Sequence, residues 1–487
     1  MGAILTHVIE FVTDMDLAVY FYPDVIDLQL KFRSPGWSEF ATGETTFAQA
    51  RDRRMGMSTA VQEAVSNFDI GLRIRTMAVT AAIVLAMTII AAPAAQAQTL
   101  SVLHTFTGKG DGGSPYAGVT IDQAGNLYGT TATGGAAGYG TVFKLSNTKT
   151  GWTLSTLYTF QGGADGGYPY ARVVFGPDGA LYGTTSDYGI SGAYGTVFSL
   201  RPPSSACRSV LCPWTKTVLY HFQSGADGAI PGYGDLAFDA AGNIYGTTFF
   251  GGGGADCTYS NCGVVYKLSR SGASWTESVL HRFSDSGDGG SNPETGVILD
   301  SAGNLYGTTF LGGVYSNGGV AYKLSPSQGW METVLHSFGA INDASSPFGG
   351  LIMDQQGNLY GTTTEGPTND YGGTVYELQP SGDSWTYSTL ADLPGDTLTN
   401  GPFAALTMDA AGSLYGTTVS DGSRGAGNVF ELTPSGGGWI YTDLHDFNGH
   451  DGSDPLGGVV LDAHGNMYGT TSATSSSIYG EVWELTP

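Results

Sequence analysis

Charged residues are scarce in this sequence, and basic residues are the scarcest. Asp, Glu, Lys and Arg make up 13% of the 487 residues, about half of the ~25% that is usual in soluble proteins. Lys and Arg number 19 against 43 Asp and Glu, which gives a formal net charge of −24. A surface that binds nucleic acid needs many Lys and Arg side chains, so the composition argues against a nucleic-acid partner.

Glycine and aromatic residues are abundant instead. The chain has 76 Gly and 27 Tyr, and Phe, Trp and Tyr together make up 12% of it. The glycine share is more than twice the usual ~7%. Disordered chains are poor in aromatics, and coiled coils or helical arrays would be rich in Ala, Glu, Lys and Leu. The composition therefore predicts an all-β protein with many tight turns.

Residues 73–97 have the three-part pattern of a secretory signal peptide. Two arginines form a basic start, an apolar run follows over 77–92, and the segment ends on small residues at Ala97. The apolar run of about 16 residues is shorter than the ~20 that span a bilayer. We therefore expect cleavage after Ala97 and a secreted or cell-surface product, residues 98–487, without a membrane span.

The sequence before this segment resembles a different family. Residues 4–50, with the text HVIEFVTDMDLAVYFYPDVIDLQLKFRSPGWSEFATGETTFA, resemble half of a glyoxalase/bleomycin-resistance (vicinal oxygen chelate) domain. A strand, a helix that begins at an Asp14 cap, and three strands are expected, which is a small α+β fragment. His7 and Glu39 match the family's metal-ligand positions, but the family needs two such modules, so we expect no function for them. A gene-fusion remnant or a misplaced start codon, followed by a linker over 51–72, would explain this region.

One phrase recurs seven times in the rest of the sequence. The four residues Tyr-Gly-Thr-Thr return every 53 to 63 residues. The copies begin at Tyr128, Tyr182, Tyr245, Tyr306, Tyr360, Tyr415 and Tyr468. A period near 50 in β-type sequence is typical of β-propellers, in which each repeat forms one blade.

The fifth copy shows the expected strands most plainly. Strand A is expected over 350–354, strand B over 359–364, strand C over 374–378 and strand D over 385–390. Turns rich in Gly, Asp and Pro separate them. Four antiparallel strands per copy make a propeller blade.

The two ends of the repeat array complement each other. Residues 100–106 read as a strand D without a blade, and residues 481–486 read as a strand C that no strand D follows. Pairing of these two segments would complete the seventh blade and leave no exposed sheet edge. The sequence therefore predicts a closed seven-bladed β-propeller over residues 98–487.

The repeat is also similar to a known family. The pattern D-x-x-G-N-L-Y-G-T-T…G-x-V-F-x-L…W-T resembles the GloVer (Gloeobacter–Verrucomicrobia) tandem repeat of secreted and surface bacterial proteins, over residues 100–487. Members often end in a cell-surface sorting segment, and no such segment precedes Pro487, so free secretion is expected rather than anchoring. The resemblance implies no particular activity.

The longer loops of the repeats identify the expected binding surface. In a propeller the B–C and D–A loops share one face, and here they are longer than the A–B and C–D turns on the other face. Most D–A loops contain an Asp-Gly followed by Pro, with the aspartates Asp111, Asp165, Asp227, Asp288 and Asp451. One interpretation is a set of carboxylates that binds Ca²⁺ or a polyol. The other, which the repetition favours, is that Asp-Gly starts a tight turn and Pro directs the chain into strand A.

Other repeated residues are expected to be structural. An aspartate that ends strand A is expected to cap the A–B turn. The repeated Tyr and Trp residues could stack on sugars, but their recurrence in nearly every blade favours a role in the core between blades. Four histidines share one strand-D position, and because strand D is outermost they are too scattered for a shared metal site. The aspartates are Asp122, Asp178, Asp239, Asp300, Asp354, Asp409 and Asp462, and the histidines are His104, His281, His336 and His445. No single blade shows a Ser-His-Asp or paired-acid cluster.

The four cysteines form two closely spaced pairs. Cys207 and Cys212 lie in the second repeat's C–D loop, and Cys257 and Cys262 lie in the third repeat's B–C loop, on the opposite face. Of the three pairings that four cysteines allow, the local ones, 207–212 and 257–262, are therefore expected. Each disulfide would close an insertion and contribute about 2 kcal/mol or less, because the closed loop is short.

These observations predict a secreted, non-enzymatic, monomeric binding protein whose partner is an extracellular glycan or surface protein. No cofactor is expected apart from the Ca²⁺ considered above. Two alternatives stay open. An extracellular metal-assisted lyase or hydrolase would hold a divalent ion tightly, and a structural surface protein would self-assemble in concentrated solution.

Overall fold

A computed structural model describes residues 98–487, apart from 188–191, 193, 204–213, 254–261, 273, 285–287, 316, 368–371, 396–400 and 475–478. Within residues 1–97 it describes the course of four strands. The chain divides into two compact units, Met1–Ala94 and Ala95–Pro487. A bilayer-spanning helix is absent from the described part of the chain.

The first unit contains one four-stranded sheet. Its strands are β1 (Ile9–Phe11), β2 (Gln29–Ser34), β3 (Trp37–Thr42) and β4 (Thr45–Ala50). They lie in the order β1-β4-β3-β2, with β1 parallel to β4 and the other neighbours antiparallel. One strand followed by three is the expected order. The helix expected after Asp14, the residue His7 and the segment 73–97 lie outside the described residues.

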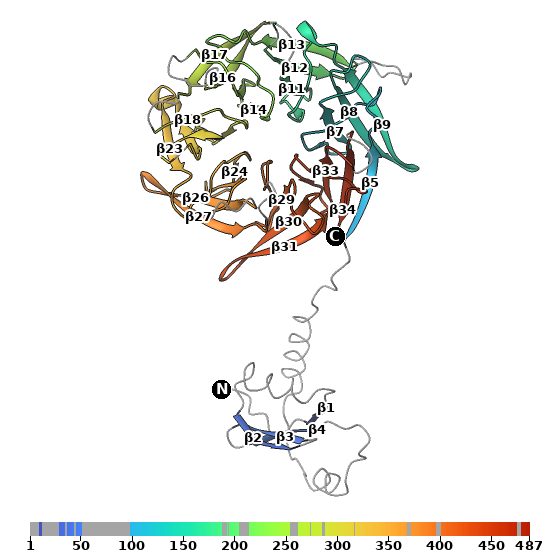
Figure 1. The fold of residues 1–487 in the computed structure, drawn as a ribbon, viewed down its shortest axis with the longest axis vertical. Coiled ribbons are helices and arrows are strands. Elements are labelled where there is room, and N and C mark those ends of the chain that lie inside the picture. The colour runs from blue at the N-terminus through green and yellow to red at the C-terminus, as the bar shows by residue number, and fades with distance from the viewer. Residues whose placement is uncertain are drawn as a thin grey trace, which may run out of the picture. The chain divides into compact units, whose positions relative to one another are not determined.

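The second unit is a ring of seven sheets around one axis, as Figure 1 shows. Each sheet has four antiparallel strands in the order A-B-C-D, with strand A nearest the axis. We number the blades 1 to 7 in the order of the Tyr-Gly-Thr-Thr copies. The predicted all-β, seven-bladed propeller is confirmed.

The four strand positions recur from blade to blade. Strands A are β6 (Thr120–Ile121), β10 (Val174–Phe175), β14 (Ala237–Phe238), β19 (Ile298–Leu299), β24 (Ile352–Met353), β28 (Thr407–Met408) and β32 (Val460–Leu461). Strands B are β7 (Leu127–Thr131), β11 (Leu181–Thr185), β15 (Ile244–Thr248), β20 (Leu305–Thr309), β25 (Leu359–Thr363), β29 (Leu414–Thr418) and β33 (Met467–Thr471). Strands C are β8 (Thr141–Thr148), β12 (Thr196–Arg201), β16 (Val264–Ser271), β22 (Val320–Leu324), β26 (Thr374–Ser381), β30 (Asn428–Ser435) and β34 (Glu481–Thr486). Strands D are β9 (Gly151–Thr159), β13 (Thr215–His221), β17 (Ser274–Arg282), β23 (Glu332–Ser337), β27 (Ser384–Asp392), β31 (Gly438–Asp446) and β5 (Thr99–Thr105). Blade 4 also has the short strands β18 (Gly290–Ser291) and β21 (Leu311–Gly312), and single-turn 3₁₀ helices occur at η1 (Gly163–Asp165) and η2 (Pro326–Gln328).

The ring closes where the first and last strands of the second unit pair. β5 runs antiparallel to β34, with Leu100 opposite Leu485 and Thr105 opposite Glu481. The Thr105 hydroxyl also donates to Glu481 Oε1 at 2.8 Å. Blade 7 therefore consists of β32, β33, β34 and β5, and Figure 1 shows β33, β34 and β5 lying together. The predicted closure is confirmed.

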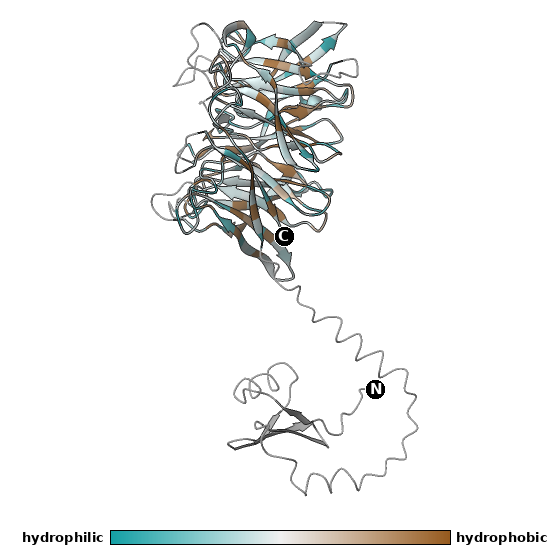
Figure 2. Cartoon of the chain, turned by 90° about the vertical axis from the view of Figure 1, so that its right-hand side faces the viewer, coloured by the Kyte–Doolittle hydropathy of each residue, from teal (hydrophilic) through white to brown (hydrophobic). Residues whose placement is uncertain are grey.

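The hydrophobic core lies along the strands and between neighbouring blades. Figure 2 shows the hydrophobic residues within the sheets. A tryptophan near the start of strand D packs on the strand-B tyrosine of the preceding blade. The Trp385 ring lies 6.0 Å from the Tyr306 ring, and the Trp439 ring lies 6.2 Å from the Tyr360 ring, between centroids. The predicted role of these aromatics between blades is confirmed.

The tyrosine of each Tyr-Gly-Thr-Thr copy closes the A–B turn. In blade 1, Asp122 Oδ1 accepts from the backbone N–H groups of Ala124 (2.9 Å) and Asn126 (2.8 Å), and the Tyr128 hydroxyl donates to Oδ2 (3.1 Å). Burial opposes the charged carboxylate, but these bonds outweigh burial and lower the pKa of Asp122. A tyrosine–aspartate bond of this kind occurs in every blade, so the predicted turn-capping role is confirmed.

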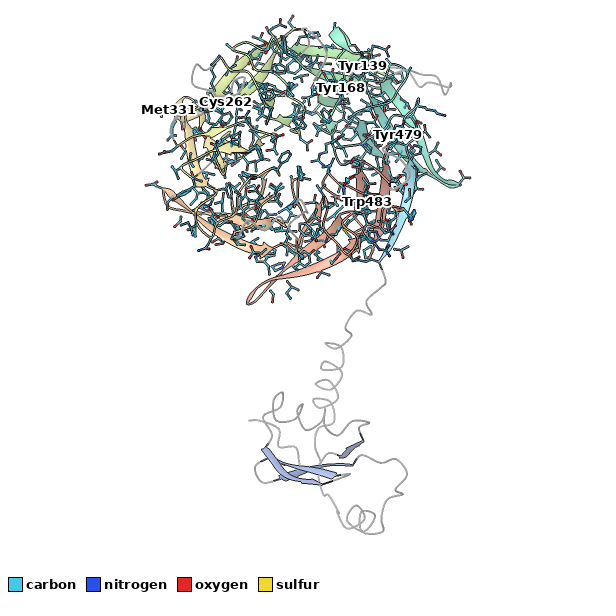
Figure 3. All side chains as sticks on the ribbon, viewed as in Figure 1. Tyr139, Tyr168, Cys262, Met331, Tyr479 and Trp483 are labelled. Carbon is cyan, nitrogen blue, oxygen red and sulfur yellow. The ribbon has the colours of Figure 1, made fainter. Side chains whose placement is uncertain are left out.

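The glycine of the motif leaves room for an aromatic ring from strand C. A Cβ atom on Gly129 would lie 2.4 Å from the Phe143 ring, and one on Gly469 would lie 2.3 Å from the Trp483 ring. Both rings are fully buried, and Figure 3 labels Trp483 in blade 7. The other five blades have the same close approach. A residue without a side chain is therefore needed at this position.

The first threonine of the motif joins neighbouring blades. The Thr130 hydroxyl donates to the backbone carbonyl of Ala171 in blade 2 at 2.9 Å. Equivalent bonds start from blades 3 to 7. In blade 2 the Thr184 hydroxyl is buried and has no partner among the described residues. The segment of blade 3 that faces Thr184 has one more residue between Pro231 and strand A than the other blades have. This extra residue displaces the backbone carbonyl that would otherwise accept from the Thr184 hydroxyl.

This difference gives a matched pair of substitutions. Thr130→Val is expected to lower the free energy of unfolding by roughly 1–3 kcal/mol, because it leaves a buried carbonyl without its donor. Thr184→Val makes the same change where no bond exists, and we expect it to be neutral or slightly stabilising. Urea unfolding midpoints of the two variants check this, and equal losses would show that the bond does not stabilise the ring.

Candidate functional site

The D–A and B–C loops of each blade meet on one side of the ring. Backbone bridges join Gly113 to Thr133 in blade 1 and Ser453 to Ala473 in blade 7, and β18 pairs with β21 in blade 4. These loops share one face, as predicted, which we call the loop face. The A–B and C–D turns form the opposite face, which we call the turn face.

Two of the predicted D–A loop aspartates bond to a histidine of strand D. Asp111 accepts from the backbone N–H of Thr107 at 2.9 Å, and its Oδ2 lies 3.3 Å from His104 Nε2. Asp451 Oδ2 lies 3.1 Å from His445 Nε2. Burial works against the charge of Asp111, but the bonds from Thr107 and His104 together lower the pKa of Asp111. Three of the repeated histidines therefore hold D–A turns rather than approach one another, whereas His281 Nε2 lies 3.4 Å from Glu332 Oε2 in blade 4.

The other predicted aspartates differ in their partners. The hydroxyl of Tyr158 donates to Asp165 at 2.6 Å, and the hydroxyl of Tyr220 donates to Asp227 at 3.1 Å. Asp288 is exposed. No three His, Cys, Asp or Glu side chains in the described ranges gather closely enough to hold a metal ion. Binding of Ca²⁺ or a polyol at these aspartates stays a prediction.

Residues just after the D–A loop proline form a belt from blade to blade; the belt residue is the first after the proline in six blades and the second in blade 3. The Tyr170 ring lies 4.9 Å from Tyr116 and stacks on Tyr233 at 5.2 Å, between centroids. The Phe348 ring lies 4.4 Å from Phe403 in the next blade. Neighbouring blades approach most closely near the axis, so this belt surrounds the axis on the loop face. We call it the aromatic girdle, and its positions are Tyr116, Tyr170, Tyr233, Glu294, Phe348, Phe403 and Leu456.

Blade 4 places a carboxylate in the girdle. Glu294 is 8% exposed, and its Oε2 has no hydrogen-bond partner among the described residues. Burial raises the pKa of Glu294 to about 8, and no neighbouring charge contributes to this shift. Two further rings, one from blade 3 and one from blade 4, extend the girdle. Phe249 lies 6.2 Å from Tyr233, and Phe310 lies 5.6 Å from Phe348, between ring centroids.

A cleft of about 560 Å³ opens between blades 4 and 5 on the turn face. In blade 5 the C–D hairpin extends to a tight turn in which Ser381 pairs with Ser384. Blades 1, 3 and 6 have the same extension. In blade 4 strand C ends at Leu324, and η2 replaces the extension. The shorter hairpin leaves the neighbouring surface of blade 5 uncovered.

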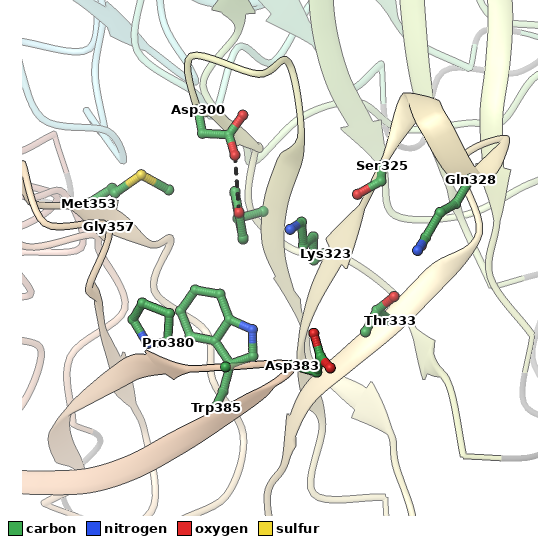
Figure 4. A pocket seen from close by; sticks show the side chains of 12 residues that line it. Asp300, Lys323, Ser325, Gln328, Thr333, Met353, Gly357, Pro380, Asp383 and Trp385 are labelled. Atoms are coloured by element: carbon green, nitrogen blue, oxygen red, sulfur yellow. Dashed lines mark hydrogen bonds between the residues drawn. The ribbon is translucent and has the colours of Figure 1, made fainter.

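The cleft combines an aromatic wall with polar side chains, as Figure 4 shows. Trp385 comes from blade 5, and Lys323 comes from blade 4, where its ammonium group lies 5.5 Å from the centre of the Tyr306 ring. The polar and aromatic lining residues include Asp300, Lys323, Gln328, Thr333, Asp383 and Trp385. Gln328, Thr333 and Asp383 are exposed. An aromatic face beside donors and acceptors can bind a polyhydroxylated ligand.

Comparison with known proteins identifies the repeat. The Gloeobacter/Verrucomicrobia repeat matches residues 88–259, 210–388 and 319–487, which together exceed half of the chain. The chain belongs to the Gloeobacter/Verrucomicrobia repeat family. The resemblance of residues 100–487 to this repeat is thereby confirmed. No curated protein matches the chain.

Solved propellers are similar to this repeat-family protein at low identity. A Bacteroides uniformis protein assigned as a 6-phosphogluconolactonase is 14% identical, with 67% of this chain and 83% of that chain covered and a TM-score of 0.43. A Thermus thermophilus protein assigned as a glucose dehydrogenase is 16% identical, with 64% and 95% covered and a TM-score of 0.38. PorZ, a surface component of the type-IX secretion system of Porphyromonas gingivalis, is 13% identical, with 72% and 44% covered and a TM-score of 0.39. Similarity at this level transfers no function.

The cysteines of the Gloeobacter/Verrucomicrobia repeat protein are described only in part. Cys262, labelled in Figure 3, is 1% exposed and is not a free thiol. Cys207, Cys212 and Cys257 lie outside the described residues. The pairings 207–212 and 257–262 therefore stay predictions.

Sequence analysis missed both the girdle and the cleft, although the sequence carries a signal for each. The residue after the D–A loop proline is aromatic in most repeats but is Glu294 in blade 4. In blade 4 Trp330 follows Leu324 by six residues, whereas Trp385 follows Leu378 by seven. An aligned comparison of the repeats would have identified both departures.

Proposed function

We propose that this Gloeobacter/Verrucomicrobia repeat protein is a secreted, non-enzymatic binding propeller that holds an extracellular glycan in the cleft between blades 4 and 5. The cleft carries the proposal, because it places an indole beside several polar side chains at a position where one blade departs from the repeat. Export rests on the signal-like segment 73–97.

The side chains of the cleft suit a sugar better than an apolar ligand. The Trp385 indole offers a flat apolar surface to the C–H face of a sugar ring. Gln328 and Thr333 can donate and accept hydrogen bonds, and Asp383 can accept from two hydroxyls. These three residues reach water, so a ligand exchanges their bonds to water rather than breaking bonds within the protein.

Trp385→Ala is expected to weaken binding of the glycan at least about tenfold, which corresponds to ~1.4 kcal/mol. A glycan array probed with the full chain would identify the ligand, and titration calorimetry would give the dissociation constants. Trp439→Ala is the matched control, because it removes the same inter-blade contact in blade 6, away from the cleft.

The control separates binding from folding. Equal weakening in both tryptophan variants would assign the effect to stability. Asp383→Ala removes an exposed polar group without touching the core, and we expect it to weaken binding as well. Retention of no glycan by the full chain would contradict the proposal.

A further inference from the structure

Glu294 is a buried acid that the fold alone does not explain. Six blades fill its girdle position with an aromatic residue or Leu456. A buried carboxylate without a partner costs several kcal/mol, and folded proteins normally pair such a group or neutralise it. Its Oε2 has no partner among the described residues, so the missing partner is to be sought outside the described protein groups.

The segment that carries Glu294 is bonded to two phenylalanines through Asn292. The Asn292 side-chain amide donates to the carbonyl of Phe249 at 3.1 Å, and the backbone N–H of Phe310 donates to the carbonyl of Asn292 at 3.0 Å. These bonds hold the two phenylalanines beside the segment that carries Glu294. Tyr233, a girdle ring of blade 3 next to Phe249, is 41% exposed. The segment that carries the carboxylate is thus bonded to two phenylalanines that contact girdle rings, and one of these rings reaches solvent.

We propose that Glu294 and the neighbouring girdle rings bind a ligand through an ammonium group. A cation is the partner that a carboxylate and the faces of aromatic rings have in common. The girdle lies on the loop face, whereas the glycan cleft lies on the turn face. The proposal therefore goes beyond the proposed function and does not depend on it.

Binding of a cation at Glu294 should depend on pH. Burial raises the pKa of Glu294 to about 8, so the empty site holds a proton at pH 7 and loses it by pH 9. A cation binds the ionised form, so affinity is expected to rise roughly tenfold between pH 7 and pH 9. Binding at pH 7 should release close to one proton. Asp235 of the flanking blade 3 is paired with Arg172 of blade 2 at 2.5 Å.

Titration calorimetry of the full chain tests the proposal with choline, propylammonium and the neutral analogue 3,3-dimethyl-1-butanol. Either cation should bind saturably with a Kd near or below about 1 mM, and the alcohol should not bind. Glu294→Gln keeps the shape of the side chain and removes a buried charge, so the variant should fold. We expect it to weaken cation binding at pH 9 at least about tenfold and to abolish the pH dependence.

Glu377→Gln is the matched control, because Glu377 is also 8% exposed but accepts from the Tyr360 hydroxyl at 2.9 Å. It should leave cation binding unchanged. Phe348→Leu should weaken choline binding several-fold through the loss of a ring face. Absence of saturable binding by both cations, equal binding of the alcohol, or unchanged binding in Glu294→Gln would each overturn the proposal. None of these outcomes bears on the glycan cleft, which Trp385→Ala tests separately.

Discussion

Deletion of residues 98–106 is expected to lower the melting temperature of the propeller by more than about 10 °C. The deletion removes β5, so the strand pairing between β5 and β34 is lost. It also removes Leu100, Leu103 and Phe106, which pack against the cores on both sides of blade 7. Loss of a buried Phe side chain such as Phe106, which is 2% exposed, costs roughly 3–5 kcal/mol. The partly buried Leu100 and Leu103 add to this, so the total exceeds the loss from any single substitution considered above.

The deleted chain should also associate with itself. Without β5, strand β34 becomes a sheet edge with unpaired backbone groups, and such an edge pairs readily with other strands. Size-exclusion chromatography is expected to show dimers or aggregates. Addition of a synthetic peptide with the sequence of residues 98–106 should restore both the monomer and the melting temperature.

Replacement of residues 98–106 by a Gly/Ser segment of equal length is the control for chain length. This variant should melt like the deletion, because it lacks the side chains of β5. A melting temperature equal to that of the unmodified chain would mean that the ring is held without the pairing of its ends, and that β5 does not stabilise the closed propeller.

The fold could be predicted from the sequence because its determinants are local and repeated. The aspartate of each A–B turn and the glycine that follows it lie close in sequence, so the pattern alone identified the turn, although it did not show the bond from Tyr128 to Asp122. Closure of the ring could be predicted because the last repeat lacks a strand D and the first segment of the array reads as a strand D without a blade. These features need no knowledge of how neighbouring blades approach.

The sequence signals mark where blade 4 departs from the repeat pattern, but they do not show a site, because the candidate sites depend on contacts between blades. Tyr170 and Tyr233 are 63 residues apart in sequence and stack only because the ring brings successive D–A loops together. The cleft depends on a hairpin extension that blade 4 lacks, and an absent element leaves no residue to single out. The Tyr and Trp repeats were correctly read as core, yet Trp385 also lines the cleft.

The contact between Gly469 and Trp483 predicts a strong coupling between two substitutions. Gly469→Ala is expected to destabilise the protein by roughly 1–3 kcal/mol, because its Cβ would lie 2.3 Å from the buried indole. Trp483→Ala is expected to cost roughly 3–5 kcal/mol, because it leaves a cavity in blade 7. The double variant should lose clearly less than the sum of the two losses, since the new methyl group occupies space that the indole has vacated.

Unfolding midpoints of the four proteins in this cycle measure the coupling, with Gly436→Ala as the control. A Cβ atom at Gly436 meets nothing within 4 Å, so that substitution should change the midpoint little and should add independently to Trp483→Ala. Additive losses for Gly469 and Trp483 would show that the aromatic ring does not impose the glycine. A coupling of the expected sign would extend to the other six blades, because each places an aromatic ring of strand C over the same glycine. Each of the first three residues of the Tyr-Gly-Thr-Thr motif would then be required by one contact. The tyrosine closes the A–B turn, the glycine leaves room for the strand-C ring, and the first threonine bonds to the neighbouring blade.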